Sequence, residues 1–106
     1  MVLKFEYNNT IFYLGENAQD NWNLLSKNKN FIWLHLNSFS SGHCVIESDD
    51  IKDKKLINYG SLLVKNGSKY KDMKNLKVIY TQLKNVTKGS NIGEVNIKGK
   101  CKFITI

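Results

Sequence analysis

The sequence contains no arginine, no proline and no long apolar run. Without arginine, the chain lacks the planar guanidinium group that best recognises guanine edges and phosphates through paired hydrogen bonds. No stretch approaches the roughly 18–20 apolar residues needed to span a bilayer, and the first residues lead directly into a strand-like pattern. We therefore expect a protein without a membrane segment or signal peptide, located in the cytoplasm, with a nuclear location left open.

Cysteine is also scarce, and Cys44 and Cys101 both lie in apolar, strand-like runs. They form no C-x-x-C pair, so we interpret them as buried hydrophobic residues. A disulfide between them is not expected in a reducing compartment. His43 and Cys44 are adjacent and point to opposite faces of a strand, which argues against a zinc site with His35. The sequence predicts no metal and no cofactor.

The chain of 106 residues is long enough for one modest hydrophobic core, so we expect a single domain over residues 1–106. Its 42% hydrophobic and 11% aromatic content is typical of a folded chain. The patterning predicts an α+β fold with a mostly antiparallel sheet and two helices. The expected segments are a hairpin over 2–14, a helix capped by Asn17, strands over 31–36 and 43–47, a helix from 48–50 to Gly67, a strand over 77–82, and a terminal hairpin of 94–98 with 101–106.

Turn and cap residues support these boundaries. Asn8-Asn9 and Gly99-Lys100 are expected to form the turns of the two hairpins. The residues at 48–50 are Ser, Asp and Asp, which are typical of a helix start. Gly60 inside the second helix costs about 1 kcal/mol relative to alanine, which indicates that this helix packs closely on the sheet.

The charge of the chain is unevenly distributed. Residues 1–50 hold three lysines and six acidic residues, a net charge of −3, whereas residues 51–106 hold thirteen lysines and three acidic residues, a net charge of +10. Clustered lysines favour a polyanionic partner because they release counterions from phosphates. Codon bias in an AT-rich genome also produces a lysine excess, so charge alone indicates nucleic-acid binding only weakly. We expect recognition of backbone and shape rather than of base edges.

The most distinctive segment is FIWLHLNSFSSGHCVI, residues 31–46, in which Trp33 and His35 fall on the same side of a strand. One interpretation is a tryptophan packed in the core, with a histidine hydrogen-bonded to a loop. The other is a groove in which Trp33, His35 and His43 stack a base or contact a phosphate. A histidine pair also suits acid–base cleavage of RNA, but no carboxylate lies in a motif beside it, so we expect no catalysis. Ser40, Ser41 and Gly42 form either an anion-binding nest or an ordinary polar turn.

Three blocks in the chain resemble the RNA-binding domain of the NFACT family, the NFACT-R module formerly called DUF814. The chain looks most like the small stand-alone eukaryotic members of coiled-coil domain-containing type. The blocks are YLGENAQDN (13–21), similar to a Gly-basic-Asn-Ala-x-x-Asn signature; IWLH (32–35) with SGHCV (41–45); and KVIYT (77–81), followed by Lys84, Lys88 and Gly93-Glu94-Val95. The chain departs from the family pattern at Glu16, Phe31 and Cys44, where the family usually has a basic residue, aspartate and valine.

This resemblance implies RNA as the partner, with tRNA and rRNA as candidates and DNA not distinguished. Large NFACT proteins act in ribosome-associated quality control, which implies a link to translation and to ribosome-associated proteins. A protein-interaction module docking on such a complex is the alternative, followed by a small nuclease. The oligomeric state is not predicted. The residues expected to bind nucleic acid are Asn17, Trp33, His35, Ser41, Gly42, His43, Lys65, Lys69, Tyr80, Thr81, Lys84 and Lys88.

Overall fold

Eight strands and two α-helices follow one another along the chain in a computed structural model that describes all 106 residues. Every strand pairing is antiparallel, which confirms the predicted α+β class. The elements are β1 (Leu3–Tyr7), β2 (Thr10–Leu14), α1 (Ala18–Leu24), β3 (Ile32–Leu36), β4 (Cys44–Ile46), α2 (Lys54–Asn66), β5 (Lys77–Gln82), a short 3-10 helix (Leu83–Asn85), β6 (Val86–Lys88), β7 (Val95–Ile97) and β8 (Lys102–Thr105).

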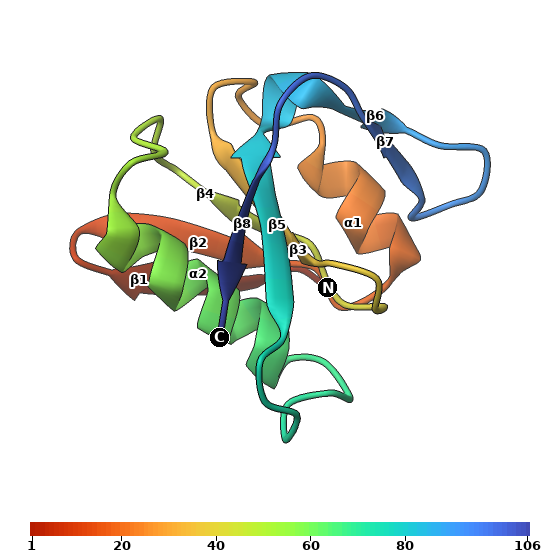
Figure 1. Ribbon diagram of the computed structural model, residues 1–106. Helices are drawn as coiled ribbons and strands as arrows, with labels where there is room; N and C mark the ends of the chain where they lie inside the picture. The colour runs from red at the N-terminus through yellow and green to blue at the C-terminus, as the bar shows by residue number, and fades with distance from the viewer.

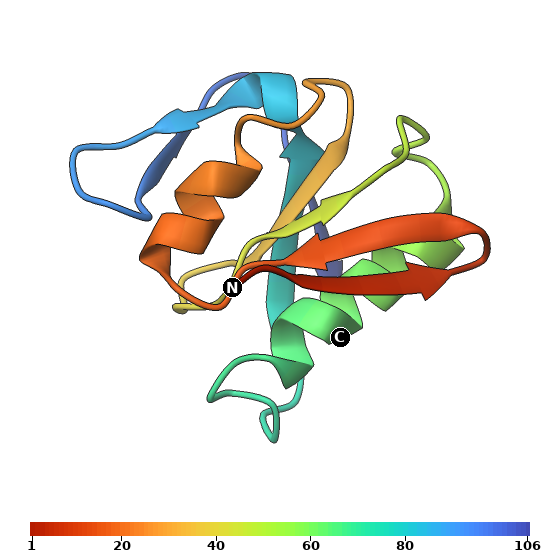
Figure 2. The same ribbon diagram turned by 180° about the vertical axis from the view of Figure 1, so that it is seen from behind.

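Six of the strands form one sheet in the order β1-β2-β4-β3-β5-β8, and β6 pairs with β7 in a separate two-stranded sheet. The two helices lie on opposite sides of the large sheet, with α2 on one face and α1 with the β6–β7 hairpin on the other (Figure 1, Figure 2). Neither helix has the length and apolar character that a membrane crossing requires.

Strand β3 is buried on both faces, because each face of the sheet is covered. Leu34 belongs to the larger cluster beneath α2, whereas Trp33 belongs to the second cluster, beneath α1 and the β6–β7 hairpin. The predicted alternation of Trp33 and Leu34 is therefore confirmed, and neither residue faces solvent. Gly60 brings α2 close to this sheet, since a Cβ atom there would lie 3.2 Å from Ile46 Cδ1.

Helix α2 begins four residues later than its predicted start at 48–50. Asp53 caps it, with its side chain accepting hydrogen bonds from the amides of Lys55 and Leu56. Residues 48–50 instead form turns in which the Asp50 amide donates to the Ser48 hydroxyl. The predicted cap of α1 is confirmed, because Asn17 Oδ1 accepts from the Asp20 amide at 2.8 Å.

The predicted terminal hairpin is wrong. Strand β7 pairs with β6, which the hydrophobic pattern did not reveal, and β8 pairs with β5 at the edge of the large sheet. Gly99, with a φ of 79°, begins a crossing from the small sheet to the large one rather than a tight turn. The first hairpin is confirmed: Asn8 and Asn9 both have positive φ, as the two-residue turn between β1 and β2 requires.

Candidate nucleic-acid interface

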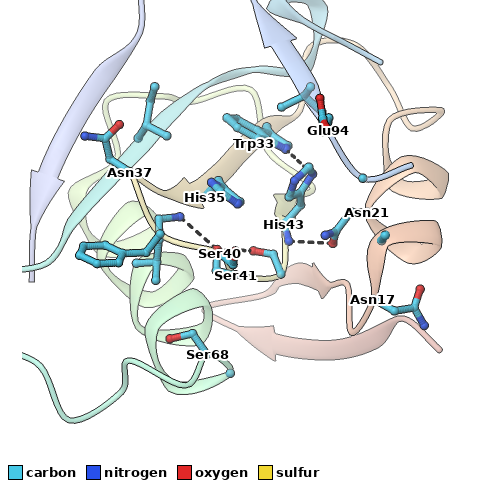
Figure 3. Close-up of a pocket in the computed structure, with 18 of the residues that line it drawn as sticks. Asn17, Asn21, Trp33, His35, Asn37, Ser40, Ser41, His43, Ser68 and Glu94 are labelled. Atoms are coloured by element: carbon cyan, nitrogen blue, oxygen red, sulfur yellow. Dashed lines mark hydrogen bonds between the residues drawn. The ribbon is translucent and has the colours of Figure 1, made fainter. Parts of the chain in front are cut away.

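A cavity of about 880 Å³ opens on the α1 side of the sheet, where four loops meet. One loop precedes α1, one joins β3 to β4, one follows α2 and one precedes β7, and side chains from all four border the space in Figure 3. Its polar and charged lining residues are Glu16, Asn17, Asn21, His35, Asn37, Ser38, Ser40, Ser41, His43, Ser68, Lys69 and Glu94.

The first two family-like blocks are held together by two hydrogen bonds, one between backbone groups and one from the backbone to a side chain. Gly15 N–H donates to the His43 carbonyl at 3.0 Å, and His43 N–H donates to Asn21 Oδ1 at 2.9 Å. Glycine is needed at both contact points, since an added Cβ at Gly42 would overlap the Gly15 carbonyl and one at Gly15 would overlap Asn21 Oδ1. Asn21 is 7% exposed, so its role is to fix the loop before β4.

The third block joins the same cluster through the turn before β7. Gly93 has a φ of 90°, and an added Cβ would lie 2.8 Å from the Ala18 side chain. Trp22 Nε1–H donates to the Glu94 carbonyl at 2.8 Å, which ties this turn to α1. Segments distant in sequence thus meet around one cavity.

Trp33, His35 and His43 form an aromatic cluster beside the cavity (Figure 3). The rings of Trp33 and His35 are stacked, with centroids 5.9 Å apart and an interplanar angle of 7°, and His43 lies edge-on to both. Trp33 Nε1–H donates to His43 Nδ1 at 3.1 Å, which places the His43 proton on Nε2. Trp33 is 1% exposed and stacks on His35, so it is not available as a platform for a base.

Both histidines are held in the neutral form. Burial, with a smaller effect of the neighbouring His35, lowers the pKa of His43 to about 3. Burial also lowers the pKa of His35, against an opposing effect of backbone groups of Leu36 and Ser41. Neutral imidazoles at pH 7 neither attract phosphate by charge nor supply the protonated member of an acid–base pair. The pair is suited to hydrogen bonding and packing.

Cys44 lies on the other face of β4, in the core beneath α2, as its adjacency to His43 predicted. Burial raises the pKa of its thiol, which disfavours the thiolate that binds metals. No three side chains of His, Cys, Asp or Glu come together in an arrangement suited to a metal ion.

The loop between β3 and β4 uses part of its hydrogen-bonding capacity internally. Ser41 Oγ accepts from the Leu36 amide at 3.1 Å and donates to the Gly42 carbonyl at 3.0 Å. Ser41 therefore stabilises the loop, and its hydroxyl is not free for phosphate. Ser38, with a φ of 69°, and Ser40 have exposed side chains at the cavity.

The predicted lysines do not all gather at this cavity. Lys69 lines it, whereas Lys65 lies on α2 and Lys84 on the 3-10 helix after β5. Lys88 Nζ lies 5.0 Å from the Trp22 ring centroid and borders a second cavity of about 610 Å³ with Lys29. The predicted lysines are thus distributed over several parts of the molecule and do not form one stripe.

Two predicted binding residues on β5 are corrected by the structure. Tyr80 is 3% exposed and packs in the core beneath α2. Thr81 is 2% exposed, and its hydroxyl donates to the Lys100 carbonyl and accepts from Asn85 Nδ2. Their side chains do not reach a surface ligand, because β5 is covered at these positions.

Several cavity residues were missing from the sequence-based candidates. Asn37 and Ser68 line the space, as does Ile92, which is 56% exposed. Asn37 follows the Trp–His strand directly, so its position gave a usable signal. Ser68 and Ile92 come from distant loops and carried no local signal, since only the folded chain brings them to the cavity.

Comparisons with known proteins bear on the family and the fold of the chain. The family model for the NFACT protein RNA binding domain matches residues 1–104. The solved C-terminal part of the fibronectin/fibrinogen-binding protein from Streptococcus suis shares the fold, with a TM-score of 0.87 and 22% identity over 97% of this chain and 44% of that chain. Our chain thus spans less than half of that structure. The search of curated proteins gave no significant match to our chain. Because the family model covers nearly every residue, the protein belongs to the NFACT RNA-binding domain family.

Proposed function

We propose that this domain binds RNA without catalysing a reaction on it. The observation that carries the proposal is the convergence of the three family-like blocks on one cavity, in a chain that belongs to an RNA-binding domain family. The net charge of +7 supports a polyanionic partner. The cavity supplies shape and hydrogen-bonding groups, and the lysines supply attraction to phosphate.

The division between shape and charge follows from the cavity's lining. Its acidic residues, Glu16 and Glu94, outnumber its one lysine, Lys69, and its histidines are neutral. A phosphate group alone would therefore gain little electrostatic binding energy in the cavity. Nucleotide groups that form hydrogen bonds suit the asparagine and serine side chains better.

The finer assignments rest on the family resemblance. We propose that the RNA is a tRNA or rRNA, that the protein acts in the cytoplasm, and that its role is linked to translation and ribosome-associated quality control. Ribosome-associated proteins are then candidate partners. The absence of catalysis is supported by the low pKa of His43, whose Nδ1 atom already accepts the Trp33 N–H group.

A salt series tests the binding. Fluorescence anisotropy with a labelled RNA hairpin should give an affinity that falls as potassium chloride rises from 50 to 200 mM, with a log–log slope of about −2 or steeper. The recovered RNA should remain intact on a gel. Absence of binding at 50 mM salt, or an affinity independent of salt, would contradict the proposal. Cleavage that is lost in His43→Ala would contradict the non-catalytic assignment.

Protein docking is the second candidate, and the sheet edges favour it. Strands β1 and β8 each have one unpaired side, and Leu3 and Tyr7 on β1 are both 37% exposed. An extended segment of a partner could add to such an edge. The Streptococcus suis neighbour is named for binding fibronectin and fibrinogen. Salt-insensitive capture of a ribosomal protein in the absence of RNA would favour docking over RNA binding.

A further inference from the structure

Beside the cavity, three side chains form a row across neighbouring strands on the α1 side of the sheet. His35 on β3 is directly opposite Ile79 on β5, and Ile79 is directly opposite Phe103 on β8. Cross-strand partners project from the same face of a sheet. The alternate residue Ile104 packs against the core beneath α2, which confirms that Phe103 projects from the opposite face.

The side chains on this face become more exposed from β3 toward β8, because α1 and the β6–β7 hairpin cover only part of it. Trp33 is 1% exposed beneath α1 and the β6–β7 hairpin, His35 and Ile79 are half-buried, and Phe103 is 53% exposed. His35 and Ile79 also line the cavity. Phe103 lies on the next strand, directly opposite Ile79, and is therefore adjacent to a residue of the cavity wall. An exposed aromatic ring on the open part of a sheet presents a π-face to a flat ligand.

The charge around Phe103 selects the type of ligand. Lys77 is two residues before Ile79 on β5, so its exposed side chain projects from the same face, and its cross-strand partner Thr105 is uncharged. Neither β5 nor β8 contains an acidic residue. From residue 73 to the end, the chain contains seven lysines and a single acidic residue, Glu94. An aromatic ring in a cationic setting suits a base attached to phosphates.

We infer that Phe103 is a stacking platform for an unpaired base, and that the domain prefers single-stranded RNA segments over blunt duplex. This inference rests on the proposed RNA-binding function and adds the part of the RNA that is recognised. Paired bases within a duplex do not present their faces, whereas bases in loops and single strands do. The base on Phe103 would place an adjacent phosphate near Lys77, and the next nucleotide would reach the cavity past Ile79.

The test compares binding of a labelled single strand and a blunt duplex of the same length to the 106-residue chain and its variants. Phe103→Leu keeps an apolar residue on the edge strand but removes the aromatic face, and Phe103→Trp keeps that face. We expect Phe103→Leu to weaken single-strand binding by about 5- to 150-fold, as for loss of a base–aromatic stack, and Phe103→Trp to bind at least as well as the wild type. Tryptophan fluorescence of Phe103→Trp should be quenched when the strand binds.

Leu62→Ala is the matched control, because Leu62 is 39% exposed on α2, at the opposite face of the sheet, and should leave binding unchanged. Thermal melting establishes that each variant is folded. Salt-dependent RNA binding that is equal for wild type and Phe103→Leu would overturn the stacking inference and leave the proposed function standing. A wild-type chain that binds neither RNA would overturn both. Equal affinity for single strand and duplex would also overturn the inference.

Discussion

His43 shows how one buried side chain links the loop cluster to pH. Its imidazole is 1% exposed, accepts from Trp33 Nε1 and has a pKa of about 3, compared with 6.5 in an unfolded chain. As the pH falls below 6.5, the unfolded state gains a proton that the folded state does not. Stability contributed by the neutral histidine is therefore complete above pH 6.5 and is lost as the pH falls toward 3.

We expect the free energy of unfolding to decrease by up to about 1.4 kcal/mol per pH unit for this histidine. Urea unfolding at pH 7, 6, 5 and 4.5 measures the slope. His43→Asn keeps an acceptor for Trp33 but does not titrate, so its slope should be smaller than that of the wild type. His35, whose pKa is also lowered, contributes to the remaining slope. A wild-type stability that is constant between pH 7 and 4.5 would be inconsistent with neutral buried histidines.

Gly42 is fixed by packing rather than by a ligand. An added Cβ would overlap the Gly15 carbonyl oxygen, a backbone atom that cannot move aside as the end of a flexible side chain can. Gly42→Ala should therefore lower the free energy of unfolding by about 1–3 kcal/mol, the usual cost of overpacking. Ser40→Ala in the same loop is the control, because that side chain is exposed and its loss should change stability little. Equal stabilities of the two variants in urea titrations would show that the loops separate easily.

At the scale of elements, the start of α2 depends on Asp53. Its carboxylate accepts from the amides of Lys55 and Leu56 at 3.1 and 3.3 Å. Asp53→Ala should cost about 1 kcal/mol of stability, with an accompanying fall in melting temperature. Asp49→Ala removes the same charge from an exposed position four residues before the cap and should cost much less. A cost at Asp49 as large as that at Asp53 would place the helix start where the sequence pattern alone had put it.

The sequence was informative wherever local chemistry determined the element. The Asn8-Asn9 turn, the Asn17 cap and the alternation of Trp33 with Leu34 all depend on residues close in the chain. The last two strands were misassigned because their partners are distant. A short strand of three residues such as β6 has too few positions for a period to be recognised, and the choice between β7 and β5 as the neighbour of β8 is made by tertiary packing.

The sequence likewise predicted some residues of the candidate site correctly and others wrongly. The blocks around Asn17, His35 and His43 do meet at the cavity, since each holds residues that pack on another block. Tyr80 and Thr81 were misjudged because period-2 alternation does not tell which faces of a strand are covered. Phe103 had no motif around it, and only the strand order and its exposure make it a candidate.

At the scale of the whole molecule, the arrangement of lysines determines which surface attracts RNA. Lys69 lines the cavity and Lys77 projects beside Phe103 from the α1 side of the sheet, whereas Lys54 and Lys55 lie in the first turn of α2, on the opposite side. Each pair carries the same charge, so net charge alone predicts equal effects on binding. Contact with phosphate predicts unequal effects.

We expect the double variant Lys69→Gln with Lys77→Gln to reduce the steepness of the salt dependence by about 1–2 units of log–log slope, since each lost phosphate contact accounts for about 0.7–0.9. The matched pair Lys54→Gln with Lys55→Gln should leave the slope near that of the wild type. Anisotropy titrations at several salt concentrations give both slopes under identical conditions. Equal losses in the two double variants would mean that RNA is attracted by overall charge, and that the face carrying the cavity and Phe103 has no special part in binding.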